Sequence, residues 1–429
     1  MSRQLTDAID ALRNLGTPEK IRAAAEQGQL APPAPVNSHI HLPPNFSAFE
    51  TVQQAVSLAA EQGLKVLGAS NYYDYQVYAD FAAETGRAGI FPLFGLEIMC
   101  LDPELREAGL RINDPGNPGK IYLCGKGITR FHPMTAEAVR LLDRIRHNDG
   151  TRMAAMVDRL EQVLAERGLA TGLDPQAVAD GIVRRHGCDP ATVWLQERHV
   201  SRAFQEALFG QLPPESRLER LAQALGTAPS TADPEDAVAI QNDIRSHLMK
   251  AGRPAFVEET FVGFEHARRL ILELGGLPSY PVIADAAQPI CDLEERPERL
   301  MAELDRRQIH AVEWIPVRNR QEVLGDYVRT LRQAGRPVTA GTEHNTLDLI
   351  PLEPQAKDAA VPEDVQAIFW EGACVVAAHQ FLNLHGECGF VDAQGRPNPD
   401  FASAEQRIET FAKWGAAVIY RYQHAPRPH

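Results

Sequence analysis

Short apolar runs alternate with helical segments along two stretches of the chain, and this alternation limits the possible folds more than any other feature. From "VNSHIHL" to "IFPLFGLEI", residues 36–98, runs typical of strands are separated by amphipathic helical segments. The same alternation returns from "GFEHARRL" to "PVTAGTEHN", residues 263–345. Strands joined by helices in this way lie parallel in a sheet or a barrel. We therefore expect an α/β fold with a parallel sheet or barrel.

The composition changes between these two stretches. From about residue 134 to 258, Ala, Leu, Arg and Glu recur at helical spacing, as in "MAAMVDRLEQVLAERG". Before this segment, "NDPGNPG" offers turn residues between short β-type runs, which indicates a hairpin-like portion. We divide the chain into an N-terminal helical segment (1–35), a first barrel part (36–133), a helical insert (134–258), a second barrel part (259–358) and a C-terminal helical extension (359–429).

The overall charge excludes some classes of partner. The chain has 429 residues and a formal net charge of −14 at pH 7, whereas proteins that grip nucleic acid or anionic membranes carry an excess of Lys and Arg. No run approaches the roughly 18 apolar residues of a membrane span, and the first residues lack the apolar core of a signal peptide. Six cysteines without a CxxC pair favour reduced thiols. We expect a cytoplasmic protein that binds a small molecule and no nucleic acid or membrane, with a homo-oligomer allowed.

Polar residues follow the predicted strands. In parallel α/β folds the loops after the strands form the site. The residues in these positions are His39 and His41; Ser70, Asn71 and Tyr72; Glu97; Lys126; Asp285; Glu313; and Glu343, His344 and Asn345. Because residues two apart on a strand share a face, His39 and His41 can point at one ion. Imidazoles with one or two carboxylates suit Zn, Mn or Fe.

Each of these residues also has an ordinary structural explanation. An isolated HxH pair is more often one solvated and one packed histidine. Glu97 could form an ion pair at a helix start, and Glu343 with His344 could cap the next segment in the turn-rich "GTEHNT". Lys126, between glycines, fits a surface turn. Their joint occurrence at successive strand ends favours a metal site, whereas we interpret His379 and His385 in the tail as structural.

The order of these motifs resembles the PHP (polymerase and histidinol phosphatase) family of metal-dependent phosphoesterases. The resemblance covers residues 36–346 and rests on "VNSHIHL", "VLGASNYYD", "PLFGLEI", "IYLCGKGI", "GGLPSYPVIADAAQP" and "PVTAGTEHN". It implies a distorted (β/α)7 barrel. The helical insert and its "ERHVSRAF" stretch are similar to the subgroup that removes phosphate from nucleotides.

The resemblance implies that one of the family's metal sites is kept. Its ligands would be His39, His41, Glu97 and Glu343, the last in place of an aspartate. The family's other two metals need histidines that this chain lacks. The aligned positions read Ser70, Asn71 and Tyr72; Tyr122; Asp285; and Asn345 or a shifted His344. We therefore expect one divalent ion, Zn, Mn or Fe.

The remaining residues receive roles in a hydrolase. Asp285 would act as general base, Lys126 would stabilise negative charge, and Tyr72 or Tyr122 would donate a hydrogen bond or proton. Arg130, Asn71, His344 and Asn345 would bind substrate. The predicted function is hydrolysis of a small phosphorylated or polyhydroxylated molecule by a metal-activated water. The alternatives are a mononuclear metal-dependent isomerase or epimerase of a sugar or sugar acid, and a catalytically inactive binding protein.

Overall fold

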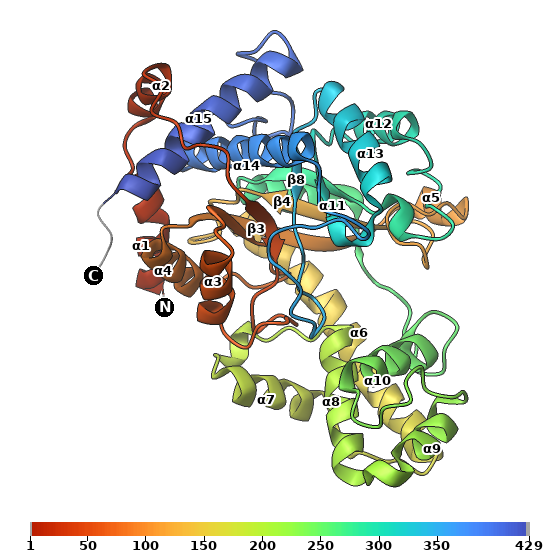
Figure 1. Ribbon diagram of the computed structural model, residues 1–429. Helices are drawn as coiled ribbons and strands as arrows, with labels where there is room; N and C mark the ends of the chain where they lie inside the picture. Colours follow the sequence, from red (N-terminus) through yellow and green to blue (C-terminus); the bar gives the residue numbers. More distant parts are fainter. Residues whose placement is uncertain (1, 426–429) are drawn as a thin grey trace.

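The computed structural model describes residues 2–425 and has a nearly closed, barrel-shaped sheet at its centre (Figure 1). The strands follow in the order β1 (Val36–Ile40), β2 (Val66–Ala69), β3 (Phe91–Leu101), β4 (Lys120–Lys126), β6 (Leu277–Val282), β7 (Ala311–Trp314) and β8 (Val338–Ala340). A bridge between Ile40 and Glu343 brings the segment after β8 back to β1. The predicted α/β barrel is confirmed.

One strand of the barrel runs against the others. β4 is antiparallel to both β3 and β6, whereas β1 to β3 and β6 to β8 are parallel within each group. In the register, Met99 lies opposite Tyr122 and Gly95 lies opposite Lys126. The start of β4 therefore lies at the end of the barrel where its neighbours finish, and Lys126 lies toward the opposite end. The short strand β5 (Val262–Gly263) pairs with β3 outside this order.

Helices cover the outside of the barrel, as the alternating pattern predicted. They are α3 (Val52–Glu61), α4 (Tyr78–Ala88), α5 (Pro103–Glu107), α11 (Phe264–Glu273), α12 (Pro297–Arg306) and α13 (Gln321–Gln333). Before the barrel, α1 (Ser2–Arg13) packs on α4, and α2 (Pro18–Glu26) packs on the C-terminal helix α15 (Ala404–His424). Local sequence sets their ends: the Thr51 hydroxyl caps α3, and Gly89 ends α4 in the left-handed conformation. Short 3₁₀ turns, η3 (Ala284–Ala286) and η4 (Pro316–Arg318), follow β6 and β7.

The long helix α14 (Glu363–Leu384) closes the end of the barrel where the parallel strands begin. The Gln380 side-chain amide accepts a hydrogen bond from the Phe94 N–H at 2.9 Å and donates one to the Pro92 carbonyl at 3.0 Å. His379 bonds the Gly275 carbonyl and the Phe390 N–H. Most side chains of α14 are buried, and α15 (Ala404–His424) packs against this helix (Figure 1).

The segment after β4 forms helices with a core of their own. They are α6 (Ala136–Glu166), α7 (Pro175–His186), α8 (Glu197–Gln211), α9 (Pro214–Leu225) and α10 (Ala237–Ile244), with a 3₁₀ turn η1 (Pro190–Thr192) and a π-helical turn η2 (Arg245–Met249). The first part of α6 packs in the barrel core through Leu141 and Leu142, and its second part packs in the insert core through Met156 and Leu160. Helix α6 thus ties the two cores together (Figure 1).

Two further expectations concern cysteines and membranes. The six cysteines are unpaired thiols. Within residues 2–425, no helix combines the length and the apolar character required to cross a bilayer.

Candidate metal centre

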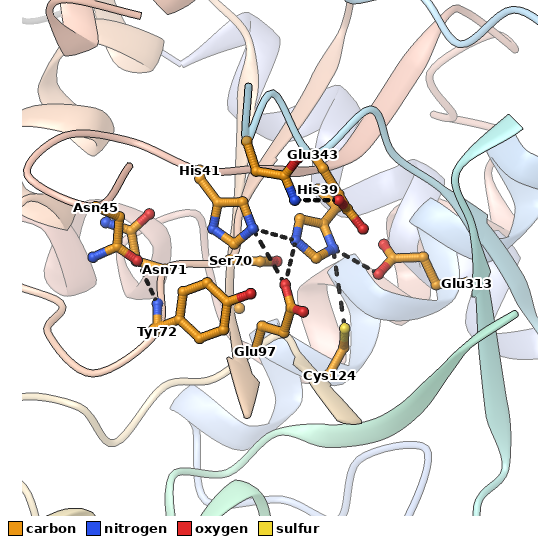
Figure 2. Close-up of polar contacts among 12 residues, drawn as sticks. His39, His41, Asn45, Ser70, Asn71, Tyr72, Glu97, Cys124, Glu313 and Glu343 are labelled. Carbon is orange, nitrogen blue, oxygen red and sulfur yellow. Dashed lines mark hydrogen bonds and ion pairs between the residues drawn. The ribbon is translucent and has the colours of Figure 1, made fainter. Parts of the chain in front are cut away.

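Three side chains from β1, the residue just after β1, and β3 converge inside the barrel. His39 lies on β1, His41 directly follows it, and Glu97 lies on β3. Nε2 of His39 and Nε2 of His41 are 3.4 Å apart, and Oε2 of Glu97 lies 3.3 Å from the first and 3.2 Å from the second. All three side chains are buried. Figure 2 shows both rings and the carboxylate pointing at one place.

The spacing of these three atoms fits a metal ion. A tetrahedral ion with bonds of about 2.0–2.1 Å holds its ligand atoms roughly 3.3–3.4 Å from one another. The measured separations of 3.2–3.4 Å have this size. The Oε2 atom of Glu97 also has no hydrogen-bond partner among the described residues, although it is buried. His39, His41 and Glu97 are therefore a group that can hold a divalent metal ion.

The charges around the group favour a cation. Burial alone would raise the pKa of Glu97, but the two imidazoles beside its carboxylate hold it far below its ordinary value. Burial would lower the pKa of His39, yet the carboxylate of Glu313 raises it to about 9. Negative charge on Glu97 and Glu313 thus holds a positive charge at His39. A metal ion on Nε2 would take the place of that proton.

Glu313 orients His39 from the other side of the ring. Its Oε2 lies 2.8 Å from Nδ1 of His39, and its Oε1 lies 2.5 Å from Nζ of Lys126. The carboxylate accepts from Nδ1–H, so Nε2 is the nitrogen that would bind a metal once it loses its proton, an arrangement common around metal-bound histidines. Cys124 Sγ lies 4.0 Å from the same Nδ1. Burial raises the pKa of Cys124 well above its usual value, so it stays a neutral thiol.

Lys126 therefore lies behind the metal group instead of facing a substrate. Its ammonium donates to the Ser38 carbonyl and to Ser70 Oγ, in addition to pairing with Glu313, and it is almost fully buried. Arg130 follows four residues after the end of β4 and donates to the Leu272 carbonyl. The roles predicted for Lys126 and Arg130 required the C-terminal end of β4 to face the site. Because β4 is antiparallel to its neighbours, that end faces the opposite way. Neither side chain lines the cavity described next.

A cavity of about 320 Å³ opens in front of the metal group, between the barrel loops and the helical insert. Glu97, Tyr72, Tyr122, Glu343 and Asn345 line it. Tyr72 stacks on the His41 ring with centroids 5.1 Å apart and planes 3° from parallel. Burial raises the pKa of Tyr72 well above its ordinary value and that of Tyr122 to about 12, so both hydroxyls stay protonated and can donate. Both predicted tyrosines thus reach the cavity.

Glu343 lies beside the metal group but has other partners. Its carboxylate forms a two-pronged ion pair with Arg318 and accepts a hydrogen bond from Asn345 Nδ2 at 2.5 Å. Its backbone adopts a left-handed φ of 57° and bonds to the backbone of β1, which fixes the residue next to His39 and His41 (Figure 2). The structure groups three of the four predicted ligands and leaves Glu343 on the cavity wall.

Two other predicted site residues serve the local structure. The Asn71 amide bonds the backbone N–H and carbonyl of Leu42. His344 stacks on Phe49, and its two nitrogens bond Thr342 Oγ1 and the Ile350 carbonyl. Neither residue lines the cavity.

Asp285, the predicted base, also turns away from the cavity. β6 ends at Val282, earlier than the sequence predicted, so Asp285 falls in the turn η3. Its carboxylate accepts from Asn319 Nδ2 at 2.9 Å and pairs with Arg320 at 3.0 Å. The neighbouring Ile283 and Ala286 line the cavity instead. The structure gives no support to a base at this position.

Several cationic side chains that line the cavity were not identified from the sequence. Lys120 begins β4, Arg198 lies in α8, Arg245 begins η2 and Arg318 ends η4, and all four line the cavity. The "ERHVSRAF" stretch, which contains Arg198, was the available signal.

No family profile matches the chain, and no curated protein sequence matches it. A protein from Bifidobacterium adolescentis assigned as a metal-dependent phosphoesterase is similar in structure, with a TM-score of 0.52 over 80% of this chain and 97% of its own, at 14% identity. This similarity establishes the fold. An amidohydrolase from Chromobacterium violaceum, solved with sulfate and no metal, covers 78% of this chain and 97% of its own, with a TM-score of 0.49 and 16% identity.

Proposed function

We propose that the protein is a metal-dependent hydrolase of the PHP type that cleaves a small phosphorylated substrate with water. The observation that carries this proposal is the triangle of His39 Nε2, His41 Nε2 and Glu97 Oε2, with sides of 3.2–3.4 Å, at the inner end of a cavity large enough for a small molecule. The motif order that resembles the PHP family supports it. The fold shared with a protein assigned as a metal-dependent phosphoesterase agrees with it.

Three protein ligands suit catalysis. Catalytic zinc sites commonly use three protein ligands, two histidines and a glutamate in some cases, and keep one position open. A divalent ion bound here would lower the pKa of water and polarise a substrate oxygen. The residues of this chain would hold the ion, fix the His39 tautomer through Glu313 and exclude bulk water by burial.

The cavity wall supplies the proton-transfer groups. Glu343, next to the metal group, is the carboxylate we assign to accept a proton from the attacking water. Arg318 and Asn345 hold it in place for this role. Tyr72 and Tyr122 remain protonated, so each can donate to the leaving group. Tyr72 is oriented by its stacking on His41.

The test is a hydrolysis screen on the full chain loaded in turn with Zn, Mn or Fe. Phosphomonoesters, phosphodiesters and sugar acids are offered, and both inorganic phosphate and substrate mass are followed. Release of phosphate that is lost in Glu97→Gln and kept in Glu298→Gln, an exposed glutamate of α12, supports the proposal. Conversion at unchanged mass would instead identify an isomerase, and no conversion of any compound would contradict both.

A further inference from the structure

The cationic side chains that line the cavity differ in whether they have an ion-pair partner. Lys120 pairs with Asp114 and Glu259, Arg318 pairs with Glu343, and Arg152 and Lys250 both pair with Glu197. The guanidinium of Arg198 has no ion pair and no hydrogen bond to any residue between 2 and 425. An unpaired guanidinium in a partly buried cavity carries donors that need acceptors. Arg198 is therefore free to bind a ligand.

A second guanidinium lies close to Arg198 and is only weakly paired. Arg245 approaches Glu197 at 3.8 Å, while the Glu197 oxygens contact Arg152 at 2.9 Å and Lys250 at 2.5 Å. Nε of Arg245 is buried without a hydrogen-bond partner among the described residues. Arg245 also begins the π-helical turn η2, a rare conformation found frequently at functional sites. Two incompletely satisfied guanidinium groups thus meet at one end of the insert.

The environment of Arg198 shows that positive charge accumulates there. Burial and the nearby Arg245 lower the pKa of Arg198 to about 10, and Arg318 acts in the same direction. Glu343 and Tyr72 act on the same guanidinium, and both also line the wall beside the metal group. The arginines and the metal group therefore border the same space.

We infer that Arg198 and Arg245 form an anion subsite that binds the phosphate group of the substrate. Two guanidiniums with unused donors match a phosphate monoester, which carries close to two negative charges and three acceptor oxygens. A carboxylate would neutralise only one of them. Both arginines come from the helical insert. The insert therefore binds the phosphate, whereas the barrel provides the metal ligands. Only the statement that this phosphate belongs to a substrate rests on the proposed function.

The experiment measures binding of inorganic phosphate by calorimetry in the His39→Ala, His41→Ala background, which cannot use the metal group. Arg198→Gln is compared with Arg202→Gln, which lies one turn along α8, pairs with Glu206 and does not line the cavity. We expect Arg198→Gln to weaken phosphate binding at least about tenfold, since a charged hydrogen-bonded partner is lost. Arg202→Gln should not change it. Arg198→Lys should recover part of the affinity. This recovery would show that a substitution at position 198 leaves the chain folded.

The outcomes separate this inference from the proposed function. Equal phosphate affinity in Arg198→Gln and Arg202→Gln would overturn the subsite. Acetate binding as tight as phosphate would overturn the choice of a dianionic group. Phosphate binding that depends on Arg198, together with a parent chain that takes up no metal on titration, would uphold the subsite and contradict the hydrolase.

Discussion

Glu313 accepts a hydrogen bond from His39 Nδ1 at 2.8 Å, on the side of the imidazole ring opposite the metal group. The same carboxylate neutralises Lys126 at 2.5 Å. Burial would raise the pKa of Glu313, but Lys126 and His39 lower it to about 2, so the carboxylate stays charged. This buried chain of charges fixes which nitrogen of His39 faces Glu97.

Glu313→Gln tests this relationship. Lys126 would keep a buried charge without a carboxylate, which should lower the free energy of unfolding by about 3–5 kcal/mol. Metal affinity should fall about 10–100-fold, because the outer partner of the histidine is weakened. Calorimetric metal titration and chemical denaturation measure the two effects. The double variant Glu313→Gln, Lys126→Met should regain most of the stability and little of the metal affinity. Unchanged metal affinity in the single variant would contradict the orienting role.

Gly341 gives a second way to displace His39. A Cβ at position 341 would lie 2.3 Å from the His39 Cβ, closer than two non-bonded carbons can approach. Gly341→Ala should therefore move His39, lower stability by about 1–3 kcal/mol, and weaken metal binding. Gly150→Ala is the matched control, since a Cβ at that position of helix α6 would point into open space. Alanine there should stabilise by up to about 1 kcal/mol. Equal metal affinity in the two variants would show that β1 tolerates the shift.

A site residue can be predicted from the sequence when its position depends on the residues close to it in the chain. His39 and His41 are predictable because strand geometry alone puts them on one face. Glu97 is predictable because β3 runs parallel to β1, with β2 between them, and carries it to the same end of the barrel. Lys126 and Arg130 were misplaced because nothing in "IYLCGKGI" reveals that β4 runs antiparallel. That direction depends on pairing with β3 and β6 and is not a property of the strand's own residues.

Tyr72→Phe tests the proposed proton donor. The ring should keep its stacking on His41, so metal affinity should be unchanged, while kcat should fall roughly 10²-fold because the hydroxyl is lost. Tyr75→Phe is the control, since its hydroxyl is buried away from the cavity and has no hydrogen-bond partner among the described residues. Steady-state kinetics on the phosphoester found in the screen decide the matter. A kcat equal to that of Tyr75→Phe would remove Tyr72 from the mechanism.

Buried neutral histidines should make the fold sensitive to acid. Burial lowers the pKa of His379 to about 4, from an ordinary value of 6.5. The unfolded chain therefore binds a proton first, and stability is lost as the pH falls from 6.5 toward 4. His379→Gln should flatten this part of the profile by no more than about 3 kcal/mol, measured by denaturation at several pH values. An unchanged slope in His379→Gln would contradict this role of His379.

Two of the four missed cavity cations share one physical cause. Arg198 and Arg245 lie in helical segments where arginine at helical spacing usually marks a solvated face. They reach the cavity because α6 carries the insert over the barrel mouth, a long-range arrangement that local pattern does not contain. The role predicted for Asp285 lacks support for a related reason. Asn319 and Arg320, which are distant in sequence, hold its carboxylate away from the cavity.

The proposed function requires that His39, His41 and Glu97 hold one divalent ion. Elemental mass spectrometry of the purified full chain, beside the His39→Ala, His41→Ala variant, tests it most directly. We predict about one equivalent of Zn, Mn or Fe per chain, absent from the variant. Equal metal content in both proteins, or no metal taken up by the parent chain on titration, would show that these three residues do not form a metal site.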